Sequence, residues 1–153
     1  MTRAFCAGFA GIVPCRLCDA ESPAFKEHPM AHQLHATCIA ACDQCAVACH
    51  HCSTACLQEQ DVKMMARCIA LDMDCAAICQ LASAAMARDS EHVQAICALC
   101  ADICDACADE CGKHSMDHCQ SCAEACRRCA QECRRMAQSP RATSTRWTSE
   151  HGH

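Results

Sequence analysis

A chain of 153 residues is long enough for one domain of ordinary size, but 22 of those residues are cysteine. Only 19 residues are Leu, Ile, Val or Phe, which is too few for a conventional apolar core, so sulfur must fill most of the interior. The net charge of −5 argues against a nucleic-acid-binding surface, and no run of about 20 apolar residues predicts a membrane span.

Glycine and proline divide the chain into three parts. Residues 1–29 hold two glycines and three prolines, which predicts an irregular N-terminal lead. Residues 30–138 contain a single breaker, Gly112, and are rich in good helix formers, so we expect them to be the folded domain. Residues 139–153 are expected to be a polar, flexible tail. The chain start carries one positive charge and two glycines in a short apolar run, a poor match to an export signal, so we expect a cytoplasmic protein.

The folded part is predicted to contain four helices, at about 31–58, 62–87, 91–111 and from about 116 to 138. Asp61 is the expected N-cap of the second helix, and Asp89 and Ser90 are expected to cap the third. Gly112 is expected to follow the third helix, with Ser115 as the N-cap of the fourth. Because the connections are short, we predict an all-α, antiparallel four-helix bundle with a cysteine-lined core.

Cysteine recurs in steps of three and four along these helices, the spacing of residues that face neighbouring helices in a bundle. Leucine normally occupies such positions, and thiols replace it here. We expect the following nineteen cysteines to be metal ligands: Cys38, Cys42, Cys45, Cys49, Cys52 and Cys56 in the first helix, Cys68, Cys75 and Cys79 in the second, Cys97, Cys100, Cys104, Cys107 and Cys111 in the third, and Cys119, Cys122, Cys126, Cys129 and Cys133 in the fourth.

Cysteines four residues apart on a helix can share one metal ion. Their Cβ atoms lie about 5–6 Å apart, and two metal–sulfur bonds of about 2.3 Å each span about 4.6 Å. Soft Cu(I) accepts two or three thiolates, and one thiolate per Cu(I) leaves no net charge in the core. A Zn²⁺ ion with four thiolates carries a charge of −2, which is costly to bury many times over.

Several other interpretations remain open at this point. A general thiol sink for zinc or cadmium would use the same cysteines, and a disulfide-stapled helical protein could pair some of them, although a reducing compartment disfavours disulfides. A copper-responsive regulator would need only one or two sites and a basic surface, and neither fits this sequence. No C-x-x-C motif sits at a strand-to-helix turn, so we do not expect an enzyme.

The cysteine succession resembles that of the bacterial cysteine-rich four-helix-bundle copper storage proteins, particularly their cytosolic branch. The resemblance covers roughly residues 30–138 and rests on stretches such as Thr37-Cys38-Ile39-Ala40-Ala41-Cys42, Ile96-Cys97-Ala98-Leu99-Cys100 and the run from Cys126 to Met136. It implies many Cu(I) ions per chain, held mainly by thiolates inside the bundle, and often a homotetramer. Cys6, Cys15 and Cys18 fall outside the resemblance and are not expected to be bundle ligands.

Histidines and one aspartate stand beside the thiols. His114 and His118 flank the turn between the third and fourth helices, and in the resembled family histidines near this turn can complete copper sites, so we include both as candidate ligands. The alternative is that they are solvated residues at the helix ends. His35 is expected near the opposite end of the bundle, and His32, His50, His51 and His92 on the surface.

Asp72 lies on the core-facing line of the second helix, where a carboxylate needs a partner or a metal. It could close a copper site, bind a backbone group or rotate to a boundary, and we expect a local structural role. Met65 and Met86 on the same line are expected to fill the core.

Taken together, these patterns predict a non-enzymatic protein that stores Cu(I). We expect loading by ligand exchange at an end of the bundle, from a copper chaperone or a small thiol. Nucleic acid and membrane are not expected partners, and the homo-oligomer is an expectation from the resemblance alone.

Overall fold

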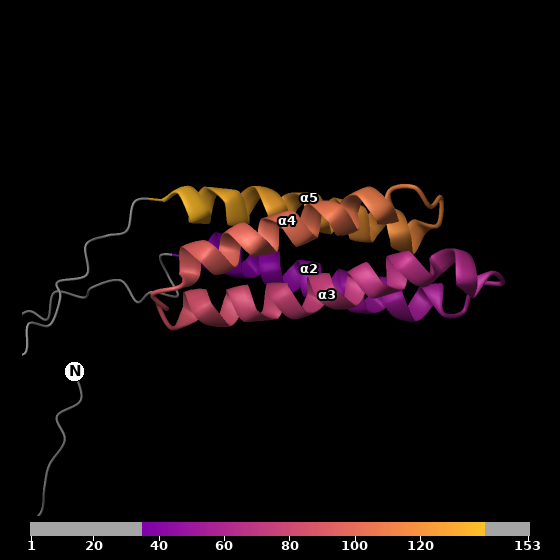
Figure 1. Ribbon diagram of the computed structural model, residues 1–153, viewed down its shortest axis with the longest axis horizontal. Helices are drawn as coiled ribbons and strands as arrows, with labels where there is room; N and C mark the ends of the chain where they lie inside the picture. The colour runs from indigo at the N-terminus through magenta and orange to yellow at the C-terminus, as the bar shows by residue number, and fades with distance from the viewer. Residues whose placement is uncertain (1–34, 140–153) are drawn as a thin grey trace, which may run out of the picture.

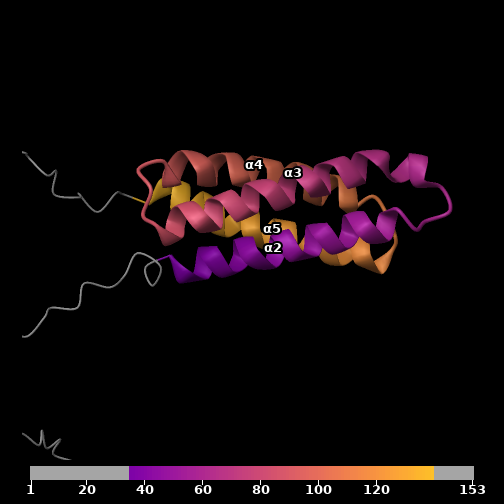
Figure 2. The same ribbon diagram turned by 90° about the horizontal axis from the view of Figure 1, so that it is seen from below.

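The computed structural model describes residues 35–139. This part of the chain forms four α-helices, α2 (Ala36–Cys56), α3 (Val62–Ala87), α4 (Val93–Cys111) and α5 (Asp117–Gln138). Consecutive helices run in opposite directions along one long axis (Figures 1 and 2). The predicted all-α four-helix bundle is confirmed. The expected N-terminal lead and all but the first residue of the expected tail lie outside the described residues.

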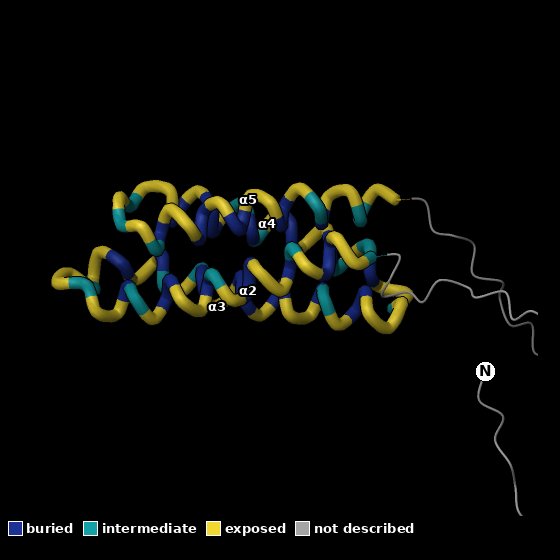
Figure 3. The backbone as a smooth tube through the Cα atoms, turned by 180° about the vertical axis from the view of Figure 1, so that it is seen from behind, coloured by how far each residue is buried: buried dark blue, intermediate teal, exposed yellow. Residues whose placement is uncertain are grey.

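Each helix packs against two others, so that the bundle is square in section. α2 lies against α3 and α5, and α4 also lies against α3 and α5, whereas the diagonal pairs make no such backbone contact within residues 35–139. Buried alanines lie between neighbouring helices, among them Ala76, Ala108 and Ala123, and their small side chains allow close approach. The interior between the diagonal helices is left for longer side chains, and the buried positions form an inward-facing stripe on every helix (Figure 3).

The ends of α3 agree closely with the sequence. The Asp61 carboxylate accepts a hydrogen bond from the Met64 backbone N–H at 3.3 Å, as expected of an N-cap. α3 runs over the predicted residues 62–87. It is also the one described helix that is long and apolar enough to cross a membrane, which we did not expect from the sequence. Its cysteine-bearing face is buried inside the bundle, so length and composition are weak evidence for a span.

Three other helix ends differ from the expectation by a few residues. α2 begins at Ala36, and α4 begins at Val93. The expected capping of α4 by Asp89 and Ser90 is wrong, because the N-cap is His92 and no side chain caps it; Ser90 Oγ instead accepts a hydrogen bond from the His92 backbone N–H at 3.3 Å. Ser115 is not the N-cap of α5, because that position is Met116 and no side chain caps it.

Gly112 follows α4 as expected, but without the backbone conformation that usually places glycine there. Its φ of −63° lies in the right-handed helical region, so the turn does not use the left-handed conformation that favours glycine at helix ends. A Cβ atom at this position would lie 3.0 Å from the Ala108 carbonyl oxygen and 3.1 Å from a nitrogen of the Arg127 guanidinium. The nearer of these atoms belongs to α4 itself, and the other is the end of a flexible α5 side chain that can move aside, so close approach of α5 does not require glycine here.

Candidate metal centre

The structure places all nineteen predicted cysteines in the interior. Eighteen have no exposed surface, and Cys38 is 3 % exposed. All nineteen are free thiols. Water is therefore excluded from the thiols, and a metal ion bound among them would have protein atoms as its only neighbours. The free thiols also count against the disulfide-stapled interpretation for this part of the chain.

Thiols of neighbouring helices meet in pairs along the whole length of the bundle. Between α2 and α5, three pairs have Sγ atoms 3.6 Å apart, namely Cys42–Cys133, Cys45–Cys126 and Cys49–Cys122. Between α3 and α4, the distances are 3.4 Å for Cys68–Cys111, 3.5 Å for Cys75–Cys104 and 3.7 Å for Cys79–Cys100. Both faces of the core therefore carry a ladder of thiol pairs.

The two ladders are joined across the diagonal of the bundle. Cys75 and Cys79 of α3 have Sγ atoms 3.8 Å and 3.7 Å from those of Cys126 and Cys129 of α5. The sulfurs therefore form a continuous network and not a set of isolated pairs. A site at one level of the bundle shares its thiols with the next level.

The network can be divided into groups of four sulfurs that lie within 4.8 Å of one another. Some of these groups overlap, because Cys45, Cys49, Cys75 and Cys126 each belong to two of them. Four groups have no member in common: Cys42, Cys100, Cys129 and Cys133; Cys45, Cys75, Cys79 and Cys104; Cys49, Cys107, Cys122 and Cys126; and Cys52, Cys56, Cys68 and Cys119. The core therefore offers four separate four-sulfur arrangements.

The spacing of the sulfurs suits bridging metal ions. The hydrogen-bonded thiol pairs have Sγ–Sγ distances from 3.4 Å to 4.0 Å. Two metal–sulfur bonds of about 2.3 Å reach about 4.6 Å when linear and less when bent. One ion can thus lie between two sulfurs without moving the helices.

Asp72 is a fully buried carboxylate at the centre of several thiols. Its Oδ1 accepts hydrogen bonds from Cys107 at 3.1 Å, Cys122 at 3.2 Å and Cys111 at 3.3 Å, and its Oδ2 accepts one from Cys68 at 3.8 Å. Burial raises the pKa of Asp72 to about 8, and the neighbouring Cys122 adds to the shift. The side chain does not rotate to a boundary, and its partners are thiols of α3, α4 and α5. It therefore links three helices, which agrees with the expected structural role.

Burial also favours the neutral form of thiols at the histidine end of the bundle. Removal from water raises the pKa of Cys56 to about 11, and it raises the pKa of Cys119 as well. Neutral thiols pack as small apolar groups, so these two cysteines need no counter-charge in the metal-free protein.

His118 lies at the end of the bundle where α2 meets α5. Its Nε2 atom is 3.5 Å from Cys56 Sγ and 3.8 Å from Glu59 Oε1, and its side chain is 14 % exposed. It also lines a surface cavity of about 480 Å³ between α2 and α5, together with His51 and Cys122. The imidazole thus connects the buried thiols with the surface.

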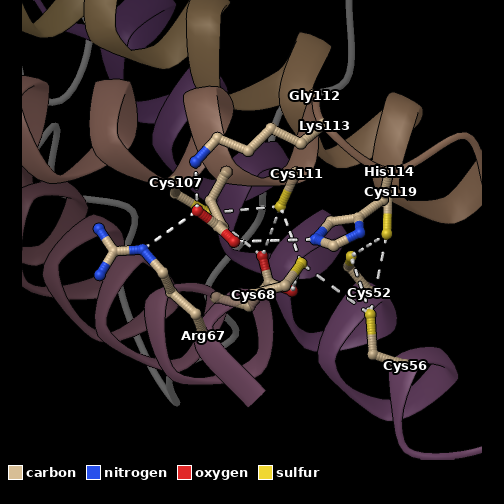
Figure 4. Close-up of polar contacts among 12 residues, drawn as sticks. Cys52, Cys56, Arg67, Cys68, Cys107, Cys111, Gly112, Lys113, His114 and Cys119 are labelled. Carbon is tan, nitrogen blue, oxygen red and sulfur yellow. Dashed lines mark hydrogen bonds and ion pairs between the residues drawn. The ribbon is translucent and has the colours of Figure 1, made fainter. Parts of the chain in front are cut away.

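His114 lies at the same end of the bundle, in the turn between α4 and α5. Its side chain is 16 % exposed, and its Nε2 atom is buried without a hydrogen-bond partner. Glu110 Oε1 lies 3.8 Å from that nitrogen. Glu110 itself is buried, and hydrogen bonding from Lys113, with a smaller contribution from Arg67, lowers the pKa of its carboxyl (Figure 4). We did not identify Glu110 from the sequence.

The remaining predicted positions agree with their expected surroundings. His35 is at the start of α2, at the end of the bundle away from the α4–α5 turn, as alternation of the helices requires. His50, His51 and His92 are exposed, and His32 lies outside the described residues. Met65 and Met86 are buried in the core.

Comparison with known proteins identifies the relatives of this chain. The family model described as "Copper storage protein" matches residues 31–138. A Bacillus subtilis (strain 168) protein named "Uncharacterized cysteine-rich protein YhjQ" is 55 % identical over 71 residues, which cover 46 % of this chain and 66 % of that protein. The aligned part thus spans just under two thirds of the curated relative.

Two solved structures share the fold at substantial identity. The Cu(I)-bound copper storage protein BsCsp3 has a TM-score of 0.66 and 55 % identity, with 69 % of this chain and 99 % of that chain covered. A cytosolic copper storage protein from Streptomyces lividans, described with five coppers, has a TM-score of 0.68 and 39 % identity, with 72 % and 97 % covered.

Proposed function

The chain belongs to the copper storage protein family, and on that premise we propose that it stores many Cu(I) ions inside its bundle. The nineteen core cysteines are the proposed ligands, with His114 and His118 completing sites at one end. Copper is the cargo of this protein, and a storage role requires no catalytic step.

The observation that carries this proposal is the continuous network of buried thiols. Overlapping groups of four sulfurs allow neighbouring ions to share thiolates, as polynuclear Cu(I) binding requires. Separate sites for divalent ions would instead need groups without common members.

Charge supports Cu(I) over a divalent ion. Each Cu(I) that binds a thiol releases one proton and forms a neutral copper thiolate, so filling the core adds no net charge. If each of the four separate groups held one Zn²⁺ with four thiolates, each site would have a net charge of about −2. No lysine or arginine is buried among the described residues to compensate that charge. A zinc or cadmium sink is the second candidate, and it is favoured only by the existence of those four groups.

We propose that copper enters at the end that carries His114 and His118. Cys56 is the thiol within 3.5 Å of His118, and the imidazole is partly exposed, so it can meet a donor. Copper would then pass inward by exchange from one thiolate to the next, since eighteen of the nineteen core cysteines have another Sγ atom within 4.0 Å. The donor is either a copper chaperone or a small-thiol complex.

We also propose a cytoplasmic location and a homotetramer. The Streptomyces lividans relative is described as cytosolic, and a reducing compartment would keep the thiols free. The tetramer follows from the resemblance to the family, and sedimentation of the full chain with and without copper would test it.

Anaerobic titration of the reduced full chain with Cu(I), with bound copper counted by elemental analysis, tests the storage function. We expect on the order of 15–20 tightly held ions, because neutral packing permits about one Cu(I) per thiolate. Saturation at one or two ions would contradict storage and would favour the interpretation as a copper-responsive regulator.

A further inference from the structure

Glu110 is a buried carboxylate whose position the copper-storage role has not yet explained. Its side chain is 9 % exposed, although it lies near the end of α4. Oε2 accepts hydrogen bonds from Arg67 Nε at 3.1 Å and from Lys113 Nζ at 2.8 Å. Arg67 belongs to α3 and Lys113 to the turn after α4, so both cations reach the same oxygen from different elements (Figure 4).

The second oxygen of Glu110 is directed at His114. Oε1 lies 3.8 Å from His114 Nε2, the nitrogen that is buried without a hydrogen-bond partner. An unpaired buried polar atom is unfavourable, because it has lost its hydrogen bonds to water and gained none in return. A small rotation of either side chain would close the gap to hydrogen-bond distance and remove that cost, so the contact has a strong reason to form.

The geometry points to Glu110 as a positioning residue for copper capture, which accepts a hydrogen bond from Nε2–H of His114 and leaves Nδ1 as the nitrogen that binds Cu(I). This inference rests on the proposed function. A neutral imidazole has one proton, and an ionised carboxylate can only accept, so the pairing places that proton on Nε2. A carboxylate behind a metal-binding histidine orients the ring and increases its basicity.

The competing interpretation is purely structural, because Glu110 also links α3 to α4 through Arg67. The two roles use different oxygens and can be separated. Glu110→Gln keeps the shape but has one oxygen. The two cationic donors hold that oxygen, and the amide N–H then faces His114 Nε2. The ring must accept there, so its proton moves to Nδ1, the nitrogen intended for copper.

Two further variants serve as controls. Arg67→Gln removes the link between α3 and α4 but leaves Oε1 of Glu110 in place. Glu132→Gln removes a carboxylate that pairs with Arg135 at 2.7 Å on α5, away from the histidines, and is a matched control for the loss of one negative charge.

The experiment reads the protonation of the His114 ring by two-dimensional ¹H–¹⁵N NMR of the ¹⁵N-histidine-labelled, reduced, metal-free full chain, assigned with His114→Gln. We expect the Nε2–H form in the wild type, in Arg67→Gln and in Glu132→Gln, and the Nδ1–H form in Glu110→Gln. Cu(I) buffered by bicinchoninate is then titrated in. In Glu110→Gln, the free Cu(I) concentration at which the His114 signals shift should rise at least about 10-fold, the smallest loss of metal affinity typical when a hydrogen-bond partner of a metal ligand is removed. In both control variants it should rise less than about 3-fold.

Wild-type His114 with its proton on Nδ1 would overturn the inference, and this measurement does not depend on the folding of Glu110→Gln. An unchanged copper response in Glu110→Gln, or an equal loss in Arg67→Gln, would overturn it as well. Total copper capacity is counted in parallel on each variant. A low capacity in the wild type contradicts the storage function itself, whereas normal capacity with an unaltered His114 contradicts only the role of Glu110.

Discussion

The Sγ atom of Cys68 on α3 lies 3.4 Å from the Sγ atom of Cys111 on α4, although 43 positions separate the two residues in the chain. Both thiols also donate to the carboxylate of Asp72, at 3.8 Å and 3.3 Å. A single residue of α3 thus organises thiols from facing helices. Because the sulfurs are already within bridging distance, copper can replace thiol protons without a rearrangement of the helices.

Removing thiols from the middle of the network should lower the copper capacity and leave the fold intact. The variant Cys100→Ser, Cys104→Ser, Cys126→Ser and Cys129→Ser should hold about four fewer Cu(I), since each thiolate accounts for about one ion and serine is a poor ligand for a soft metal. Elemental analysis after anaerobic loading gives the number, and far-ultraviolet circular dichroism checks the helices. A capacity equal to that of the wild type would mean that copper does not occupy the core.

The N-terminal cysteines provide the matched control. Deleting residues 1–29, or changing Cys6, Cys15 and Cys18 to serine, should leave the copper capacity almost unchanged. None of these three cysteines lies on the inward-facing side of a predicted helix. Loss of more than about three ions, one for each removed thiol, would instead indicate that this segment contributes to the bundle sites.

Zinc should bind in much smaller number than copper. Each Zn²⁺ requires about four sulfurs, and the four groups without common members set a limit of about four ions per chain. Burying their charge makes even that number unfavourable. Titration under the same anaerobic conditions, read by elemental analysis, should therefore give a zinc-to-copper ratio of about one to four or lower. Comparable numbers of zinc and copper would favour the general thiol sink.

The metal-free protein should already be helical. Alanine has the highest helix propensity, and neutral thiols pack like small apolar side chains. Copper should nevertheless raise the melting temperature. A ligand that binds only the folded state contributes about 4 kcal/mol when its free concentration is about a thousand times Kd, which corresponds to roughly 15 °C or more in a small domain. Circular dichroism at increasing temperature measures both effects, and a coil spectrum without copper would contradict the first.

The buried Asp72 should make the metal-free protein less stable as the pH rises. The pKa of Asp72 is about 8 in the folded protein and near 3.8 without burial, so between these values the folded state holds a proton that the unfolded chain has lost. The free energy of unfolding should therefore fall by up to about 1.4 kcal/mol per pH unit from this group. Denaturant unfolding at pH 5 to 7 should show the slope in the wild type and a smaller one in Asp72→Asn. The exposed Asp74→Asn is the control, and it should keep the wild-type slope.

The inward-facing rows of cysteines, and the thiol core that they form, follow from the sequence alone. Steps of three and four place Cys75 and Cys79 on one face of a helix whatever its neighbours are, and the scarcity of large apolar residues leaves that face to form the core. The Asp61 cap is equally local, because it depends on contacts within one turn. The same reasoning singled out Asp72, since a carboxylate on a buried face requires a partner.

Which thiols meet across helices was decided only by the tertiary structure. Periodicity defines the inward face of each helix, but the level at which Cys68 meets Cys111 depends on how far α3 and α4 slide past one another when their alanines pack. Glu110 precedes Cys111 and gives no signal in the sequence. Its burial exists only because Arg67 of another helix reaches the same oxygen as Lys113 and offsets the cost of desolvating the charge.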